Sequence, residues 1–173
     1  MNATERRSTF ALASIFALRM LGLFMIIPVF AISGQQYHGA TPALLGFAVG
    51  VYGLSQAILQ IPFSLWADRI SRRGLIIFGL LLFALGNAIA AMSVDIWQVI
   101  IGRAIAGSGA ISAVVMALLA DVTREEQRSK AMAIIGMSIG ASFMLAFVVG
   151  PLLTSYMGLK GLFWLSSIAG ILA

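Results

Sequence analysis

The sequence predicts an all-α membrane protein, arranged as a bundle of six transmembrane helices. The first observation is composition: the 173 residues are 61% hydrophobic and only 10% charged, whereas a soluble domain has about 25% charged residues. The second is a succession of apolar stretches, most of them long enough for the roughly 20 residues of a spanning helix. The third is that most basic residues gather between these stretches, as expected for loops on one side of a membrane.

Six apolar stretches are expected to be helices, because an open sheet leaves backbone groups unsatisfied in lipid. Their predicted bounds are 9–33, 42–66, 73–92, 96–120, 130–156 and 161–173. The last stretch is shorter than the roughly 20 residues that span a bilayer, and no polar residue closes it. We therefore expect residues 1–173 to form one six-helix domain with an incomplete last helix, within a longer protein.

Eight of the 11 lysines and arginines fall on one side of the membrane in this arrangement. These are Arg6, Arg7, Arg69, Arg72, Arg73, Arg124, Arg128 and Lys130. The opposite loops hold only Lys160, together with His38 and Asp95. By the positive-inside rule the N-terminus is predicted to be cytoplasmic. This placement also accounts for the net charge of +5 without a nucleic-acid partner.

Few residues in the sequence could bind a metal or carry out catalysis. There is no cysteine, and the single histidine, His38, cannot form a metal site alone. Ser108 stands between two glycines, but no histidine lies in any predicted helix to activate its hydroxyl. We predict that the protein is not an enzyme and has no metal or organic cofactor.

Two arginines, Arg19 and Arg103, lie inside predicted helices. Charged side chains at such depth are unfavourable and almost always face the bundle interior or a water-filled path. Each arginine therefore has two possible roles, which the sequence leaves open. It either locks helices together by donating hydrogen bonds to backbone carbonyls, or it takes a direct part in transport.

A polar face is predicted along the second helix, where Tyr52, Gln56 and Gln60 recur at every fourth position. In the region of the fourth helix, Ser108 and Ser112 are polar. The flexible side chain of a methionine such as Met116 suits either an apolar binding site or the core. The candidate cavity-lining residues are Tyr52, Gln56, Gln60, Ser108, Ser112 and Met116.

Small residues recur at every fourth position in three predicted helices, a pattern that lets helix backbones approach closely. They are Gly46 and Gly50, then Gly102, Ala106 and Ala110, then Gly136 and Gly140. We expect these residues to pack helices together, with smooth contacts that would let helices rock.

The segment 64–73 concentrates one acid and three arginines between two apolar helices. It resembles motif A of the major facilitator superfamily, G-x-x-x-D-R-x-G-R-R. Asp68, Arg69, Arg72 and Arg73 match this motif, whereas both glycines of the pattern are serines here. The departure keeps these two positions small.

Three further segments resemble motifs of the same family. Arg103 and Gly107 are similar to motif B without its usual glutamine, Gly150-Pro151 to the core of the antiporter motif C, and 19–28 to motif D. The chain is thus identified as similar to the N-terminal half of a twelve-helix major facilitator. A closer resemblance, to YajR-type drug/proton antiporters, is carried by residues 19–22, 52–54, 60–63 and 123–125.

The resemblance implies a secondary transporter with alternating access, built from two inverted repeats of three helices. It implies that Asp68 and Arg72 form a charge relay with Asp121 at the cytoplasmic helix ends, which latches one conformation. The other residues that it implies for the latch and for conformational change are Arg69, Arg73, Gly107, Gly150 and Pro151.

The function expected on this basis is proton-coupled efflux of drug-like or amphipathic molecules across a bacterial inner membrane. Protons are the expected coupling ion, although no acid lies deep in any predicted helix. Expected partners are the lipid bilayer, a small-molecule substrate, and a C-terminal six-helix half or a second copy. Two alternatives stay open: an inactive or self-associating half-transporter, and a uniporter or symporter for another solute.

Overall fold

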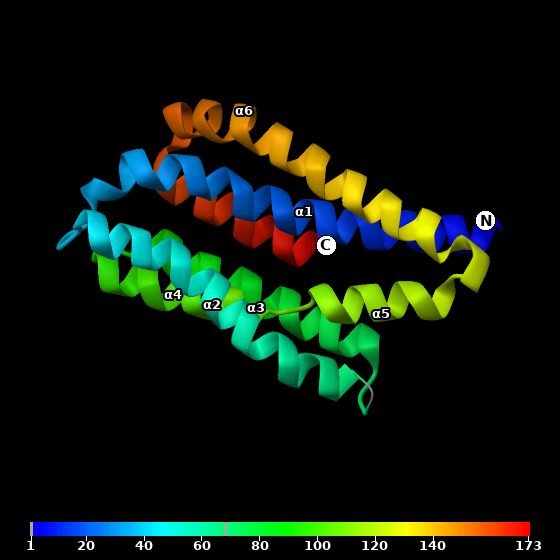
Figure 1. Ribbon diagram of the computed structural model, residues 1–173. Helices are drawn as coiled ribbons and strands as arrows, with labels where there is room; N and C mark the ends of the chain where they lie inside the picture. The colour runs from blue at the N-terminus through cyan, green and yellow to red at the C-terminus, as the bar shows by residue number, and fades with distance from the viewer. Residues whose placement is uncertain (1, 68) are drawn as a thin grey trace.

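The computed structural model describes residues 2–67 and 69–173, and this part of the chain is almost entirely helical (Figure 1). Because each helix satisfies its own backbone hydrogen bonds, such a chain is suited to lipid. The elements are α1 (Ala3–Ser33), η1 (Gly34–Gln36), α2 (Pro42–Ala67), α3 (Arg72–Met92), α4 (Ile96–Ser108), α5 (Ser112–Val122) and α6 (Glu125–Leu172).

Five helical stretches among the described residues are long and apolar enough to cross a membrane. They are Ala3–Gln36, Pro42–Ala67, Arg72–Met92, Ile96–Val122 and Glu125–Leu172. The all-helical membrane fold predicted from composition is therefore confirmed at this level. The arrangement as six spans in two inverted repeats stays a prediction.

The two helices predicted over 130–156 and 161–173 both lie within α6. At Gly158 the backbone leaves the helical conformation, with φ 66° and ψ 179°, and the ribbon turns back on itself there (Figure 1). Glycine adopts this positive φ without the steric penalty that other residues meet. The expected loop is thus reduced to a sharp turn at one glycine.

The helix predicted over 96–120 is divided into α4 and α5, although Ile96–Val122 as a whole is long and apolar enough to cross a membrane. Residues 109–111 are not helical, and they separate α4 from α5. Gly107 and Gly109 weaken the helix at this point, because glycine is a poor helix former. The Nη2 atom of Arg19 in α1 donates a hydrogen bond of 2.6 Å to the Gly109 carbonyl, which also accepts from the Ile111 amide at 2.9 Å.

Glycines bring α4 into close contact with α3 and α2. A Cβ at Gly86 would overlap the backbone of Ala106, and one at Gly102 would lie 2.7 Å from the Gly86 carbonyl oxygen. A Cβ at Gly107 would overlap the carbonyl of Tyr52 in α2. Helix backbones therefore meet directly here, as the small residues of this helix predict.

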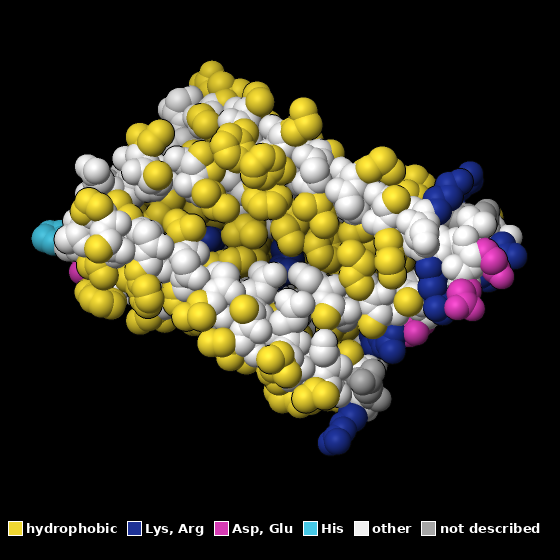
Figure 2. Space-filling view, in the orientation of Figure 1, with side chains coloured by type: hydrophobic (Ala, Val, Ile, Leu, Met, Phe, Trp, Pro, Cys, Tyr) yellow, Lys and Arg dark blue, Asp and Glu magenta, His cyan; other side chains and the backbone are white. Residues whose placement is uncertain are grey.

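The other glycine pairs do not pack within the chain. A Cβ added at Gly46, Gly50, Gly136 or Gly140 would meet nothing within 4 Å. These residues lie on α2 and α6, which are the least buried of the membrane-capable helices. On the face shown in Figure 2 a largely apolar hollow runs between these two helices.

The two ends of the bundle differ in chemistry. Charged side chains gather at one end in Figure 2, and the histidine lies at the opposite end. At the histidine end the backbone amide of His38 donates to the Val94 carbonyl at 3.0 Å, and the amide of Ile96 donates to the His38 carbonyl at 3.1 Å. The Asp95 carboxylate caps α4 by accepting from the Trp97 amide at 2.8 Å. Backbone hydrogen bonds thus join the connection before α2 to the connection before α4.

Candidate functional site

Arg19 ties three elements together inside the bundle. Its side chain is buried, and Nη2 donates both to the Gly109 carbonyl at 2.6 Å and to the Tyr52 hydroxyl at 3.3 Å. Its Nη1 atom lies 3.5 Å from the Ser112 Oγ. Of the two roles open for this arginine, the geometry matches that of a lock that joins α1 to α2 and to the α4–α5 break.

Arg103 occupies a different environment, although it is equally buried at 2% exposure. Its guanidinium carbon lies 4.6 Å from the centroid of the Tyr52 ring, a cation–π contact. Its Nη1 and Nη2 atoms have no hydrogen-bond partner in the described part of the chain. Tyr52 therefore stands between two arginines, with its hydroxyl toward Arg19 and its ring toward Arg103.

A pocket of about 370 Å³ opens beside this cluster. Three of the predicted cavity-lining residues, Tyr52, Gln56 and Gln60, line it together with Arg103. Its other walls come from Leu23, Ile27, Val49, Gly53 and Ala57. Dark-blue basic side-chain atoms are visible at the bottom of the hollow in Figure 2. The pocket therefore combines apolar walls with amides and one buried cation.

The other three candidate lining residues lie outside this pocket. Ser108 donates to the Ala104 carbonyl of its own helix at 2.8 Å. Ser112 lies beside Arg19, and Met116 packs against the core near the charged end. Periodicity within one helix could group Tyr52 with Gln56 and Gln60, but it could not place α5 relative to them.

At the charged end Arg72 forms an ion pair with Asp121, which joins the start of α3 to the end of α5. The Asp121 side chain is half-exposed, so this pair is of the weak, breakable kind. Asp68, the acid of the motif, lies outside the described residues. Arg69 is exposed in the turn before α3. A pocket of about 440 Å³ at this end is lined by Ala67, Ile70, Ser71, Arg72, Arg73, Leu118 and Asp121.

Ser71 begins α3 at a position where the family pattern has glycine. Its Oγ accepts from the Gly74 amide at 3.5 Å, as an N-cap residue does. The replacement therefore supplies a cap to the helix that carries Arg72 and Arg73.

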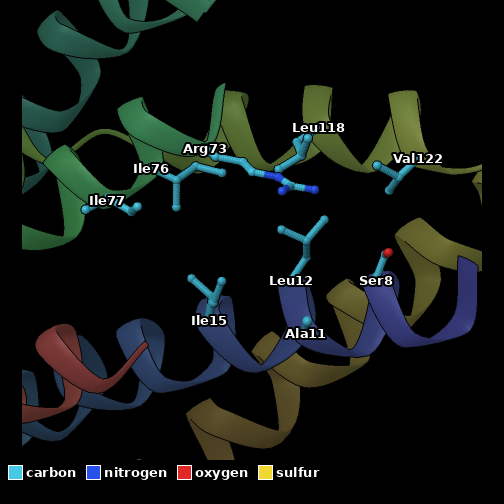
Figure 3. Close-up of a pocket in the computed structure, with 9 residues that line it drawn as sticks. All are labelled: Ser8, Ala11, Leu12, Ile15, Arg73, Ile76, Ile77, Leu118 and Val122. Atoms are coloured by element: carbon cyan, nitrogen blue, oxygen red, sulfur yellow. The ribbon is translucent and has the colours of Figure 1, made fainter. Parts of the chain in front are cut away.

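Arg73 lines the pocket of about 440 Å³ together with Arg72 and Asp121. Its side chain crosses a separate pocket of about 300 Å³ between α1, α3 and α5 (Figure 3). The rest of that pocket is apolar except for one hydroxyl: Ser8, Ala11, Leu12, Ile15, Ile76, Ile77, Leu118 and Val122. Arg73 therefore lines both pockets, whereas Arg72 pairs with Asp121.

Two of the three predicted conformational residues lie at helix contacts. Gly107 meets the backbone of Tyr52, and a Cβ at Gly150 would lie 3.0 Å from the Met25 carbonyl oxygen in α1. Pro151 is exposed on α6. Both glycines thus allow close approach of neighbouring helices.

Sequence reasoning missed an ion pair between Glu5 and Arg124. Arg124 Nε donates to Glu5 Oε1 at 2.9 Å, and the Arg124 backbone amide donates to the same oxygen at 3.2 Å. Arg124 Nη2 also donates to Asn2 Oδ1 at 3.1 Å. The hydrogen bond that the Arg124 guanidinium donates to the Glu5 carboxylate raises the pKa of Arg124 above its ordinary value. No local pattern shows a contact across 119 positions.

Replacing Glu5 with glutamine is expected to release the N-terminus from Arg124, because the carboxylate accepts from both the Nε atom and the backbone amide of Arg124. Backbone amides in residues 3–9 should then exchange with deuterium about tenfold faster, as local opening becomes easier. Hydrogen exchange followed by mass spectrometry measures this change. Glu126→Gln, at an exposed site, is the matched control. Equal exchange in both variants would show that the pair does not hold the N-terminus.

Comparisons with known proteins agree with the fold and the motifs. The sequence matches the Major Facilitator Superfamily profile over residues 12–173. It is 54% identical over 168 residues to the inner membrane transport protein YajR of Escherichia coli (strain K12), covering 97% of this chain and 37% of that protein. It is 32% identical over 149 residues to the class E tetracycline resistance protein of Escherichia coli, covering 84% of this chain and 36% of that protein.

A solved structure shows the same fold. A bacterial homologue of the human lysosomal transporter Spinster, in an inward-facing and unoccupied conformation, superimposes with a TM-score of 0.83 at 16% identity. The superposition covers 99% of this chain and 42% of that chain. This chain thus spans less than half the length of these relatives and corresponds to an N-terminal half. It is a multi-pass integral membrane protein that belongs to the Major Facilitator Superfamily.

Proposed function

We propose that this chain is the N-terminal half of a secondary active transporter in a bacterial inner membrane. The transporter exports drug-like or amphipathic small molecules by alternating access, and protons drive the export. The observation that carries the proposal is the pocket of Tyr52, Gln56, Gln60 and Arg103 beside an apolar hollow in a membrane-embedded bundle. A cavity with apolar walls and a few polar groups suits amphipathic ligands.

A second bundle completes the transport path in this proposal. The open glycine faces of α2 and α6 provide a smooth surface for it, since small residues let helices approach closely. The occupant is a C-terminal six-helix half, as the greater length of the relatives supports. Native mass measurement distinguishes this case from a self-associating half-transporter, which would form a dimer of the 173-residue chain alone.

The cytoplasmic charges couple the proton to the conformational change. Arg72 and Asp121 hold α3 and α5 together through a pair that is half-exposed and can break. Protonation of an acid in this cluster, Asp121 or Asp68, removes one charge and loosens the latch. Relatives named tetracycline resistance protein and multidrug resistance protein support drug-like molecules as the exported class.

Asp121→Asn tests this coupling, because it removes the charge while preserving the shape of the side chain. In proteoliposomes that contain the chain paired with its second bundle, a pH gradient should drive tetracycline transport about tenfold less effectively, as one essential interaction is lost. Equilibration of tetracycline without a gradient should continue. Glu126→Gln serves as the charge-matched control. Full gradient-driven transport in Asp121→Asn would contradict the latch, and absence of any tetracycline flux in the unmodified protein would contradict this substrate class.

A further inference from the structure

The described part of the bundle contains two buried arginines without a carboxylate partner, Arg19 and Arg103. Both terminal nitrogens of Arg103 are buried and lack a hydrogen-bond partner among the described residues. By sequence position, all acids of the chain lie at helix ends or between helices: Glu5, Asp68, Asp95, Asp121, Glu125 and Glu126. Asp95, at the start of α4, is about 12 Å from Arg103 along the helix. No acid among residues 2–67 and 69–173 is therefore placed to neutralise Arg103.

Such a charge is strongly unfavourable in a low-dielectric interior unless an anion pairs with it. The contact with the Tyr52 ring compensates only in part, because it leaves the guanidinium donors unused. Arg19 provides the internal comparison. Its Nη2 atom donates to Gly109 and Tyr52, so its position is explained by contacts within the bundle. Arg103 has no such explanation.

The pocket beside Arg103 has the chemistry to receive the missing anion. The half-buried amides of Gln56 and Gln60 lie in the same lining and can donate to an oxygen. A guanidinium matches the two oxygens of a carboxylate with two parallel hydrogen bonds. The side chains of Leu23, Ile27 and Val49 supply an apolar wall for the rest of a ligand.

We propose that this pocket binds the carboxylate of an amphipathic substrate, with Arg103 as the group that recognises the acid. The proposal rests on the transport function above and narrows its substrate class from amphipathic molecules in general to those that carry a carboxylate. Gln56 and Gln60 orient the acid, and the apolar wall accommodates its hydrocarbon part.

Binding to the 173-residue chain in nanodiscs of zwitterionic lipid tests the proposal, with empty nanodiscs subtracted. Three probes of similar size are compared by calorimetry at pH 7: 3-phenylpropionate, its neutral amide and 2-phenylethylammonium. The acid should bind about tenfold or more tightly than the amide, because its hydrogen bonds to Arg103 are charge-assisted. The ammonium should bind least. Equal affinity for the acid and the amide would overturn the proposal.

Variants of Arg103 locate the effect. Arg103→Gln should abolish the preference for the acid, whereas Arg103→Lys should retain part of it because the charge remains. Arg6→Gln removes the same charge at an exposed site and should leave the preference unchanged. If circular dichroism shows that Arg103→Gln does not fold, Arg103→Lys serves as the test. Either complete loss or full retention of the preference for the acid over the amide in Arg103→Lys would contradict the proposal.

The counter-ion could also come from a carboxylate of the second bundle. In that case the preference for the acid would disappear once the second bundle is bound, and Arg103→Gln would weaken association with the second bundle. That result overturns a substrate role. Binding is measured without a gradient, so the two proposals can fail separately. Binding of the acid without proton-driven flux would contradict only the proposed transport function. Proton-driven flux without a preference for the acid would contradict only this inference.

Discussion

Gly107→Ala is expected to destabilise the bundle by about 1–3 kcal/mol, the usual range for forcing extra atoms into a packed interior. The new Cβ would overlap the carbonyl of Tyr52, which is backbone and cannot rotate away. Separating α4 from α2 would also shift the Tyr52 ring relative to Arg103. Thermal unfolding in detergent, followed by far-ultraviolet circular dichroism, measures the loss as a lower midpoint.

The matched control is Gly50→Ala on α2. This glycine has no neighbour within 4 Å of a Cβ, so the substitution should be neutral or stabilising, because alanine is the better helix former by about 1 kcal/mol. The two variants add the same methyl group to a helix. Equal midpoints for both would show that the close contact between α4 and α2 does not limit stability.

Arg19→Met is expected to open the α4–α5 break. The Tyr52 hydroxyl would lose the donor that now reaches it, and the Gly109 carbonyl would keep only the Ile111 amide at 2.9 Å. A buried group without a partner costs about 1–3 kcal/mol. Removing the buried charge of Arg19 offsets part of this loss in the free energy of unfolding. Hydrogen exchange near the break is therefore the more sensitive measurement. Amides of 109–115 should exchange with deuterium at least about tenfold faster.

Arg103→Met distinguishes a local role from a general effect of losing a buried arginine. This side chain has no hydrogen bond to the break, so exchange at 109–115 should remain as in the unmodified chain. Faster exchange in both variants, or in neither, would contradict the assignment of Arg19 as the lock.

Much of the fold follows from composition and charge placement, because a bilayer allows few architectures. The apolar stretches locate α1, α2 and α3 within a few residues, apart from the longer N-terminal end of α1. Two features resisted this reasoning. The break after Ser108 depends on a hydrogen bond from Arg19 in another helix, and the turn at Gly158 depends on one backbone angle. Neither signal is present in local hydropathy.

The candidate site was predictable where its residues share one helix. The spacing of Tyr52, Gln56 and Gln60 placed them on one face, and they line one pocket. What the spacing could not show is that Tyr52 mediates between Arg19 and Arg103, since that depends on how three helices pack. Burial alone does not distinguish Arg19 from Arg103, because both are buried. They differ in their hydrogen-bond partners.

The two ends of the bundle are held together by different kinds of bond. Around His38 the elements are joined by backbone hydrogen bonds, which dissolved ions do not weaken. At the far end they are joined by side-chain ion pairs, Arg72 with Asp121 and Arg124 with Glu5. Their side chains are partly exposed, so added salt weakens these pairs. The contacts at the His38 end therefore keep their strength as ionic strength rises, whereas those at the charged end weaken. Opening of the bundle is expected to begin at the charged end.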